Sequence, residues 1–233
     1  MTPTALARLL QLSSQALPIG GYSHSQGLES AIEHGLVKNE PSVQGWILDV
    51  LEFSMKSFEI PWMLSMGAAW AAGDSAAVAS MNEEFLSTRE SAELRAAAVQ
   101  MGFSLRALLD VLPDFPADLL DTLRSIPEPS LPCVWSAAAT AWQIETREAV
   151  MGYLWAWAEN QVLVAMKALP LGQSAGQRVL LKIGLSIAEI AAHMNSGGIA
   201  SPGMSNGCYS NFSPGLAILS SLHETQYSRL FRS

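Results

Sequence analysis

The sequence predicts an all-α fold, a single compact domain of about ten helices with a C-terminal segment that docks to a partner. Alternating polar and apolar residues never continue long enough for a strand, whereas Ala, Leu, Met and Gln recur in almost every segment with a spacing of about 3.6 residues. Four prolines also fit the first turn of a helix, where a missing N–H costs little: Pro41, Pro116, Pro132 and Pro214.

These patterns predict helices over residues 4–14, 23–34, 41–57, 61–73, 75–87, 90–111, 116–125, 132–144, 147–168, 173–195 and 214–223. Ser87 followed by Glu90 predicts a capping box at the start of the helix expected over 90–111.

The segment from Leu17 to Glu29 combines a proline–glycine turn with the start of the second helix. Ser23 followed by Gln26 predicts a capping box and a helix that begins near Ser23, and Gly35 fits the position just after its end. The segment is dense in hydrogen-bonding side chains, which is typical of either a tight turn or a contact surface: Tyr22, Ser23, His24, Ser25, Gln26 and Glu29.

The helices expected over 147–168 and 173–195 are apolar on nearly every face, so we expect both to be buried at the centre of the domain. Polar side chains nevertheless interrupt them: Glu159, Asn160, Gln161, Lys167, Lys182, Glu189 and His193. A buried charge is costly unless it is paired. These groups therefore either pair inside the core or at a wet edge, or they line a polar path or a partner surface.

Residues 196–212 are dominated by Gly, Ser, Asn and Pro, so no helix is expected there. Such a long loop in a compact domain is typically functional or disordered. It carries apolar side chains that need a surface to cover them: Ile199, Met204, Cys208, Tyr209 and Phe212. We therefore expect a helical core over residues 1–195 and a docking segment over residues 196–233, with a flexible tail as the alternative.

The composition excludes several classes of protein. Only 15% of the residues are charged, against about 25% in typical soluble domains, so much of the surface is expected to be apolar or covered by a partner. The net charge of -8 argues against nucleic-acid binding, and two cysteines do not make a disulfide framework. The longest apolar run, residues 60–72, is too short to span a bilayer and contains Pro61. No basic-then-apolar leader is visible, so we expect a cytoplasmic protein that does not bind membranes.

The motifs of common enzymes are missing. No Walker A sequence occurs, and residues 21–25 lack the final glycine and the preceding strand of a nucleophile elbow. The four histidines are scattered and show no metal-binding spacing: His24, His34, His193 and His223. We therefore expect no enzyme activity, no resident metal site and no tightly bound cofactor.

Several motifs, in order along nearly the whole chain, resemble the urease accessory protein F (UreF) family. They are Leu9–Leu12, Leu17–Glu29, Thr88–Arg95, Gln100–Gly102, Tyr153–Val162, Lys167, Leu169–Gln173, Ser210–Gly215 and Tyr227–Phe231. The resemblance implies an all-helical homodimer without enzyme activity. It implies that the chain binds a second accessory protein, UreD (also called UreH), and recruits the GTPase UreG to deliver nickel to apo-urease. Whether such a chain activates the GTPase or restrains it stays open.

The resemblance also suggests site residues. It places Tyr22, Glu29 and Lys167 on the GTPase-facing side, and alanine at Glu29 or Lys167 is expected to impair urease activation without destabilising the fold, if both are exposed. The UreD-facing side maps to Tyr209, Phe212, Arg229, Leu230 and Phe231. A water-filled path for nickel in transit would be lined by Glu159, Asn160, Gln161 and His193. Two alternatives remain, a helical metal-dependent hydrolase and a generic helical scaffold.

Overall fold

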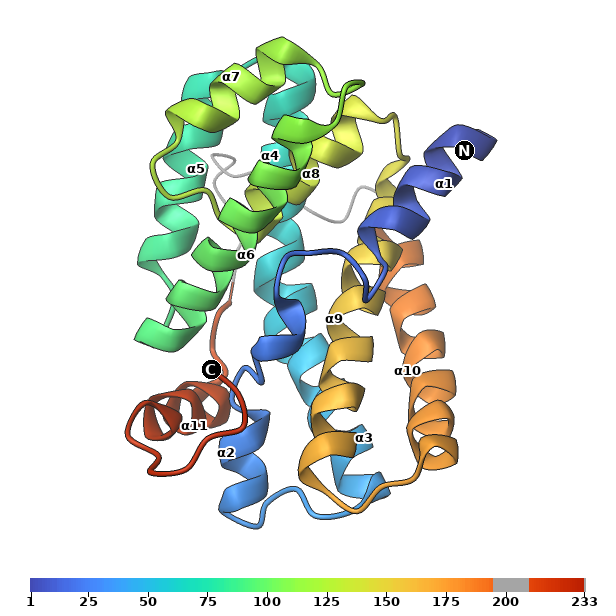
Figure 1. Ribbon diagram of the computed structural model, residues 1–233, viewed down its shortest axis with the longest axis vertical. Helices are drawn as coiled ribbons and strands as arrows, with labels where there is room; N and C mark the ends of the chain where they lie inside the picture. Colours follow the sequence, from blue (N-terminus) through green and yellow to red (C-terminus); the bar gives the residue numbers. More distant parts are fainter. Residues whose placement is uncertain (195–209, 233) are drawn as a thin grey trace.

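The computed structural model of the chain describes residues 1–194 and 210–232. Within these residues it holds eleven α-helices, a 3-10 turn and a π-helical segment, and it contains no strand, so the all-α prediction is confirmed (Figure 1). The elements are α1 (Pro3–Leu12), η1 (Gly21–Ser23), α2 (Leu28–Glu33), α3 (Glu40–Val50), η2 (Leu51–Glu59), α4 (Ile60–Ala72), α5 (Ser75–Ser87), α6 (Ala92–Val111), α7 (Ala117–Ser125), α8 (Leu131–Ala141), α9 (Thr146–Ala168), α10 (Gln173–Met194) and α11 (Pro214–Glu224).

The second helix does not begin near Ser23, so the capping box predicted there is wrong. The Oγ of Ser23 instead donates to the carbonyl oxygen of Gly20 at 2.7 Å and closes the 3-10 turn η1. Gln26 and Gly27 follow with φ values of 50° and 85°. Helical backbone requires negative φ, so α2 can begin only at Leu28.

The capping box predicted at Ser87 and Glu90 is also wrong. Ser87 belongs to the last turn of α5, where its Oγ donates to the carbonyl oxygen of Glu84 at 2.8 Å. The side chain of Ser91 caps α6 instead and accepts a hydrogen bond from the N–H of Leu94 at 3.1 Å.

The break expected between residues 57 and 61 is absent. The π-helical segment η2 joins α3 to α4, and the N–H of Ile60 donates to the carbonyl oxygen of Met55, five residues back. Segments of this kind are rare in proteins and are often found at functional sites. Here the segment delivers Glu59 to the interior.

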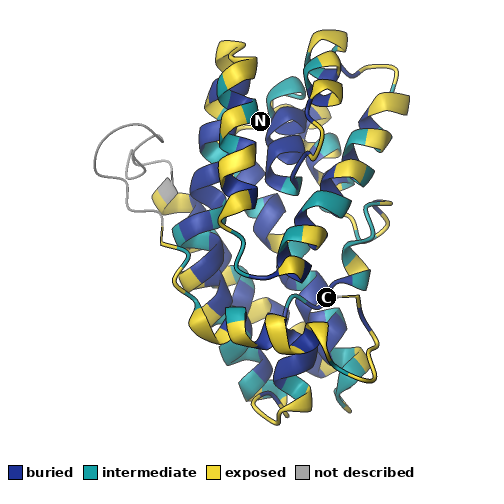
Figure 2. Cartoon of the chain, turned by 90° about the vertical axis from the view of Figure 1, so that its left-hand side faces the viewer, coloured by how far each residue is buried: buried dark blue, intermediate teal, exposed yellow. Residues whose placement is uncertain are grey.

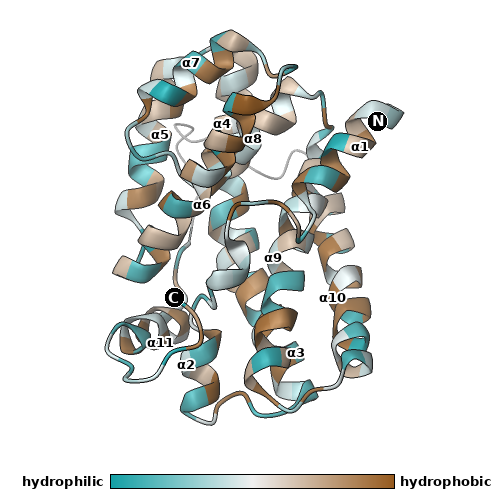
Figure 3. Ribbon diagram, in the orientation of Figure 1, coloured by the Kyte–Doolittle hydropathy of each residue, from teal (hydrophilic) through white to brown (hydrophobic). Residues whose placement is uncertain are grey.

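Helix α9 lies at the centre of the fold and packs against α1, α2, α3, α8 and α10. Its expected burial is confirmed. The same expectation for α10 is wrong, because among the described residues α10 packs mainly by one face, against α9 and α3. Leu181 and Leu185 on its other face are 72% and 68% exposed. Figure 1 shows α10 at one side of the molecule, and Figure 3 shows apolar residues along it.

The close approach of α6 to the loop before α8 depends on Gly102. A Cβ at this position would overlap the carbonyl oxygen of Pro129. The absence of a side chain therefore lets α6 pack directly on α8, and the buried residues form one continuous core through these helices (Figure 2).

The described part of the C-terminal segment packs onto the same core. Helix α11 lies against α2 and α6, and Leu216, Leu219 and Phe231 are buried in the core cluster. In the portion of the chain that the structure covers, no helix combines the length and apolar character needed to cross a membrane.

Candidate partner-binding site at the C-terminal strap

The end of the chain forms a strap, residues 225–232, that is tied to the start of α2. The Oε1 of Glu29 accepts a hydrogen bond from the N–H of Leu230 at 2.6 Å, and its Oε2 accepts one from the N–H of Phe231 at 3.0 Å. The N–H of Arg232 donates to the carbonyl oxygen of Ser23 at 2.8 Å. One buried carboxylate therefore holds two consecutive amides of the strap.

A group of four ionisable side chains, three of them buried and Arg229 exposed, connects the strap to α2, α6 and α11. His223, fully buried on α11, places its Nε2 3.0 Å from an oxygen of Glu29 and its Nδ1 2.7 Å from an oxygen of Glu93. Arg229 of the strap donates to the other oxygen of Glu93 at 3.0 Å. Ionised groups are stable inside a protein only when paired in this way. The cluster therefore fixes the strap to the body of the fold.

Lys167, near the end of α9, lies between two aromatic rings. Its Nζ is 5.9 Å from the ring centroid of Tyr22 and 5.6 Å from that of Phe231. Both distances allow a cation–π attraction. Tyr22 is 59% exposed, whereas Phe231 is buried beneath the lysine. An exposed surface made of Tyr22, Lys167 and the strap results.

The interior behind this surface contains a second buried ion pair. Arg89 donates to Glu59 at 3.1 Å, and the hydroxyl of Tyr153 donates to the other oxygen of Glu59. A cavity of about 70 Å³ lies beside these groups and is also bordered by Trp157 and Asn160. Its lining is mostly apolar, but Glu59, Arg89 and Asn160 border it, so its volume and these polar groups suit a few ordered waters.

The polar residues of α9 point to different surroundings. Glu159 accepts a hydrogen bond from Gln15 at 3.2 Å, and Asn160 donates to the carbonyl oxygen of His24 at 3.0 Å. Gln161 is fully buried, and its amide has no hydrogen-bond partner among the described residues. Because α9 and α10 run antiparallel, His193 lies roughly 18 Å further along the pair than Asn160. His193 is exposed, with its Nδ1 2.7 Å from the carbonyl oxygen of Glu189.

Burial also sets the charge state of three groups near the core. It lowers the pKa of His24 to about 4, with a smaller contribution from Arg232, so this ring is neutral at pH 7. It raises the pKa of the Cys133 thiol to about 12. Burial, followed by the charge of Glu59, raises the pKa of Tyr153 well above its usual range, so its hydroxyl stays a donor.

The model of the UreF family matches residues 37–184 of this chain. The chain is 49% identical over 229 residues to the urease accessory protein UreF of Dechloromonas aromatica, covering 98% of this chain and 97% of that protein. It is 50% identical over 234 residues to UreF of an Azoarcus species, covering 98% and 95%, and 45% identical over 233 residues to UreF of a Janthinobacterium species, covering the whole of both.

The chain belongs to the UreF family.

In this UreF chain, residues that the resemblance assigned to two separate surfaces lie together. Lys167, expected on the GTPase side together with Tyr22, lies over the rings of both Tyr22 and Phe231 of the strap. Glu29 was considered as an exposed charge, but its side chain is only 7% exposed and holds the strap. Glu29→Ala was expected to leave the fold stable on the condition that Glu29 is exposed. That condition is not met, because the substitution removes a buried partner of the strap and of His223.

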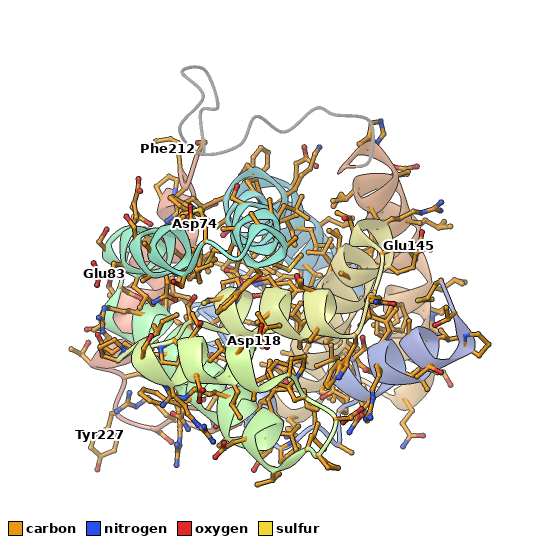
Figure 4. The ribbon with its side chains drawn as sticks, turned by 90° about the horizontal axis from the view of Figure 1, so that it is seen from above. Asp74, Glu83, Asp118, Glu145, Phe212 and Tyr227 are labelled. Atoms are coloured by element: carbon orange, nitrogen blue, oxygen red, sulfur yellow. The ribbon has the colours of Figure 1, made fainter. Side chains whose placement is uncertain are left out.

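The residues expected on the UreD side of the UreF chain occupy different environments. Leu230 is exposed on the strap, whereas Phe231 is buried. Phe212 is exposed and borders a groove of about 250 Å³ with Phe53, away from the strap. Figure 4 shows Phe212 and Tyr227 at different edges of the molecule. Tyr209 lies outside the described residues.

Sequence reasoning missed His223 and Glu93 as site residues of the UreF chain. The sequence held a sign of each residue. His223 is the only ionisable residue in the helix expected over 214–223, and Glu93 lies inside the Thr88–Arg95 motif. Among the described residues, no group of three His, Cys, Asp or Glu side chains is placed to hold a metal ion. The two carboxylates beside His223 lie on opposite ring nitrogens, so they do not converge on one point.

Proposed function

We propose that this chain is a cytoplasmic urease accessory protein that catalyses no reaction of its own. It joins UreD (UreH) and recruits and regulates the GTPase UreG in a complex that delivers nickel to apo-urease. Membership of the UreF family carries this proposal. The gathering of Tyr22, Lys167 and the strap on one surface supports it, since a shared surface suits the joining of two partners.

Complementation tests the proposed function. A urease-positive host that lacks its own gene for this protein should produce apo-urease, and the chain should restore both urease activity and the nickel content of the purified enzyme. Full-length chain that is soluble in these cells but restores neither would overturn the proposal. Turnover of urea or GTP by the purified chain alone would favour the enzyme alternative.

Lys167 is proposed to contact UreG. Lys167→Ala removes an exposed ammonium and two weak cation–π contacts, so the free energy of unfolding is expected to fall by only about 0.5 kcal/mol. Urease activation in cells should nevertheless drop. Lys38→Ala, at another exposed lysine, is the control and should leave activation unchanged. Normal activation by the Lys167 variant would remove this residue from the site.

The chain is also proposed to form a homodimer through the outer face of α10. Leu181 and Leu185 lie one turn apart on this face, next to the partly exposed Trp155. In an antiparallel pair of α10 helices, Lys182 of one copy would lie near Glu189 of the other. Apolar residues flanked by such complementary charges suit a two-fold interface.

The double variant Leu181→Glu, Leu185→Glu should therefore be monomeric, because it places four like charges in the interface. Native mass spectrometry or sedimentation at micromolar concentration measures the change, and circular dichroism should show unaltered helicity. Leu10→Glu, at an exposed leucine of α1, is the matched control and should remain dimeric. A dimer that survives the double substitution forms through another surface.

Nickel is proposed to pass along polar side chains as cargo, without a resident metal site. Asn160 borders the internal cavity of about 70 Å³, and Glu159 and Gln161 flank it in the sequence. His193 would lie at a distant point of the same path.

A further inference from the structure

The surroundings of His223 require a particular charge state of its ring. Each ring nitrogen lies within hydrogen-bonding distance of a carboxylate oxygen, 3.0 Å to Glu29 and 2.7 Å to Glu93. A neutral imidazole has one N–H and one lone pair, so it can donate to only one of them. The lone pair would then face the other carboxylate. With both carboxylates ionised, only the imidazolium, which has two N–H donors, satisfies both contacts.

The charges around His223 balance only when its ring is protonated. Glu29 faces it from α2 and Glu93 from α6, while Arg229 of the strap binds the far oxygen of Glu93. Two carboxylates, one guanidinium and one imidazolium sum to zero. Loss of the ring proton leaves a net negative charge in a site where His223 is fully buried. Such a charge is strongly disfavoured.

The same carboxylate that contacts His223 also holds the strap. Both oxygens of Glu29 accept hydrogen bonds from strap amides, and the oxygen that accepts from Phe231 also faces the ring. We propose that His223 is a proton-linked latch that keeps the C-terminal strap attached when its ring is charged and frees the strap when the ring loses its proton.

The contacts of Glu29 and His223 determine whether the strap is held more tightly at low or at high pH. The attached strap is stabilised by the charged ring, so its attachment is strongest at low pH and weakens as rising pH removes the proton. His24 cannot produce this change, since its pKa is about 4 and its ring is already neutral over the range concerned. Glu224, the neighbour of His223 on α11, accepts a hydrogen bond from the N–H of Ala92 at 3.0 Å.

Hydrogen exchange of the full-length chain tests the latch. Amide protection of Leu230 and Phe231 would be measured by NMR between about pH 5.5 and 9 and corrected for the intrinsic exchange rate at each pH. Protection is expected to be about tenfold lower with the uncharged ring than with the charged ring, the size expected for the loss of a charge-assisted hydrogen bond. Amides of Leu154 and Val162 in α9 should show no such fall. The ¹⁵N shifts of the His223 ring report its protonation directly.

His223→Gln removes the titrating group and should abolish the pH dependence of strap protection, leaving it low at every pH. Glu224→Gln on the same helix is the matched control and should retain it. If the His223 variant does not fold, the wild-type profile and the ring shifts still decide the question. A singly protonated ring at pH 5.5, or strap protection that does not change with pH in the wild type, would overturn the latch.

Discussion

Replacing Glu29 by alanine is expected to lower the free energy of unfolding by about 3 kcal/mol, at the lower end of the range for breaking a buried ion pair. The variant loses the acceptor for two strap amides and the partner of the buried His223. The cost stays at the lower end because the strap can detach and regain water. The melting temperature should fall by roughly 6–12 °C.

Two further variants identify the cause of this loss. Glu33→Ala, at an exposed carboxylate of the same helix α2, should leave the melting temperature nearly unchanged. Glu29→Gln keeps the shape and one acceptor oxygen but removes the charge, so an intermediate loss is expected. If Glu29→Ala is as stable as Glu33→Ala but no longer supports urease activation, Glu29 contacts a partner directly and does not act by holding the strap.

Removing Leu222 to Ser233 is expected to abolish complex formation with UreD while the helical core stays folded. The truncation deletes the strap and His223, and Glu29 and Glu93 then regain water instead of being left buried and unpaired. The loss of the buried Phe231 and His223 should reduce the free energy of unfolding by about 3 kcal/mol. Circular dichroism measures folding, and co-elution with UreD measures docking.

A point substitution separates docking from folding in this segment. Leu230 is 70% exposed, and its side chain takes no part in the hydrogen bonds that hold the strap. Leu230→Asp should therefore keep the melting temperature and still weaken co-elution with UreD. Full co-elution of the truncated chain would place the docking surface elsewhere, and a truncated chain that fails to fold would make the strap part of the core.

The sequence by itself determined the fold class and most helix boundaries. Helix α5 begins and ends at the predicted residues, and α7 and α8 begin within one residue of the predicted positions. These boundaries depend on interactions within one or two turns, such as a proline in the first turn or a side-chain cap. The motifs that resemble the UreF family could also be recognised from the sequence, because they consist of contiguous residues. The match to the family model and to UreF of Dechloromonas aromatica confirmed that family.

Only the tertiary structure decided what the polar side chains do. From the sequence alone, Glu29 fits an exposed helix charge. In the structure it accepts a hydrogen bond from the N–H of Phe231, 202 positions away in the sequence, and pairs with His223. The exposed leucines of α10 were likewise expected in the core. Helix propensity and capping act between near neighbours, whereas burial and charge pairing depend on which distant segments pack together. That packing brought the strap onto α2 and enclosed His223 between two carboxylates.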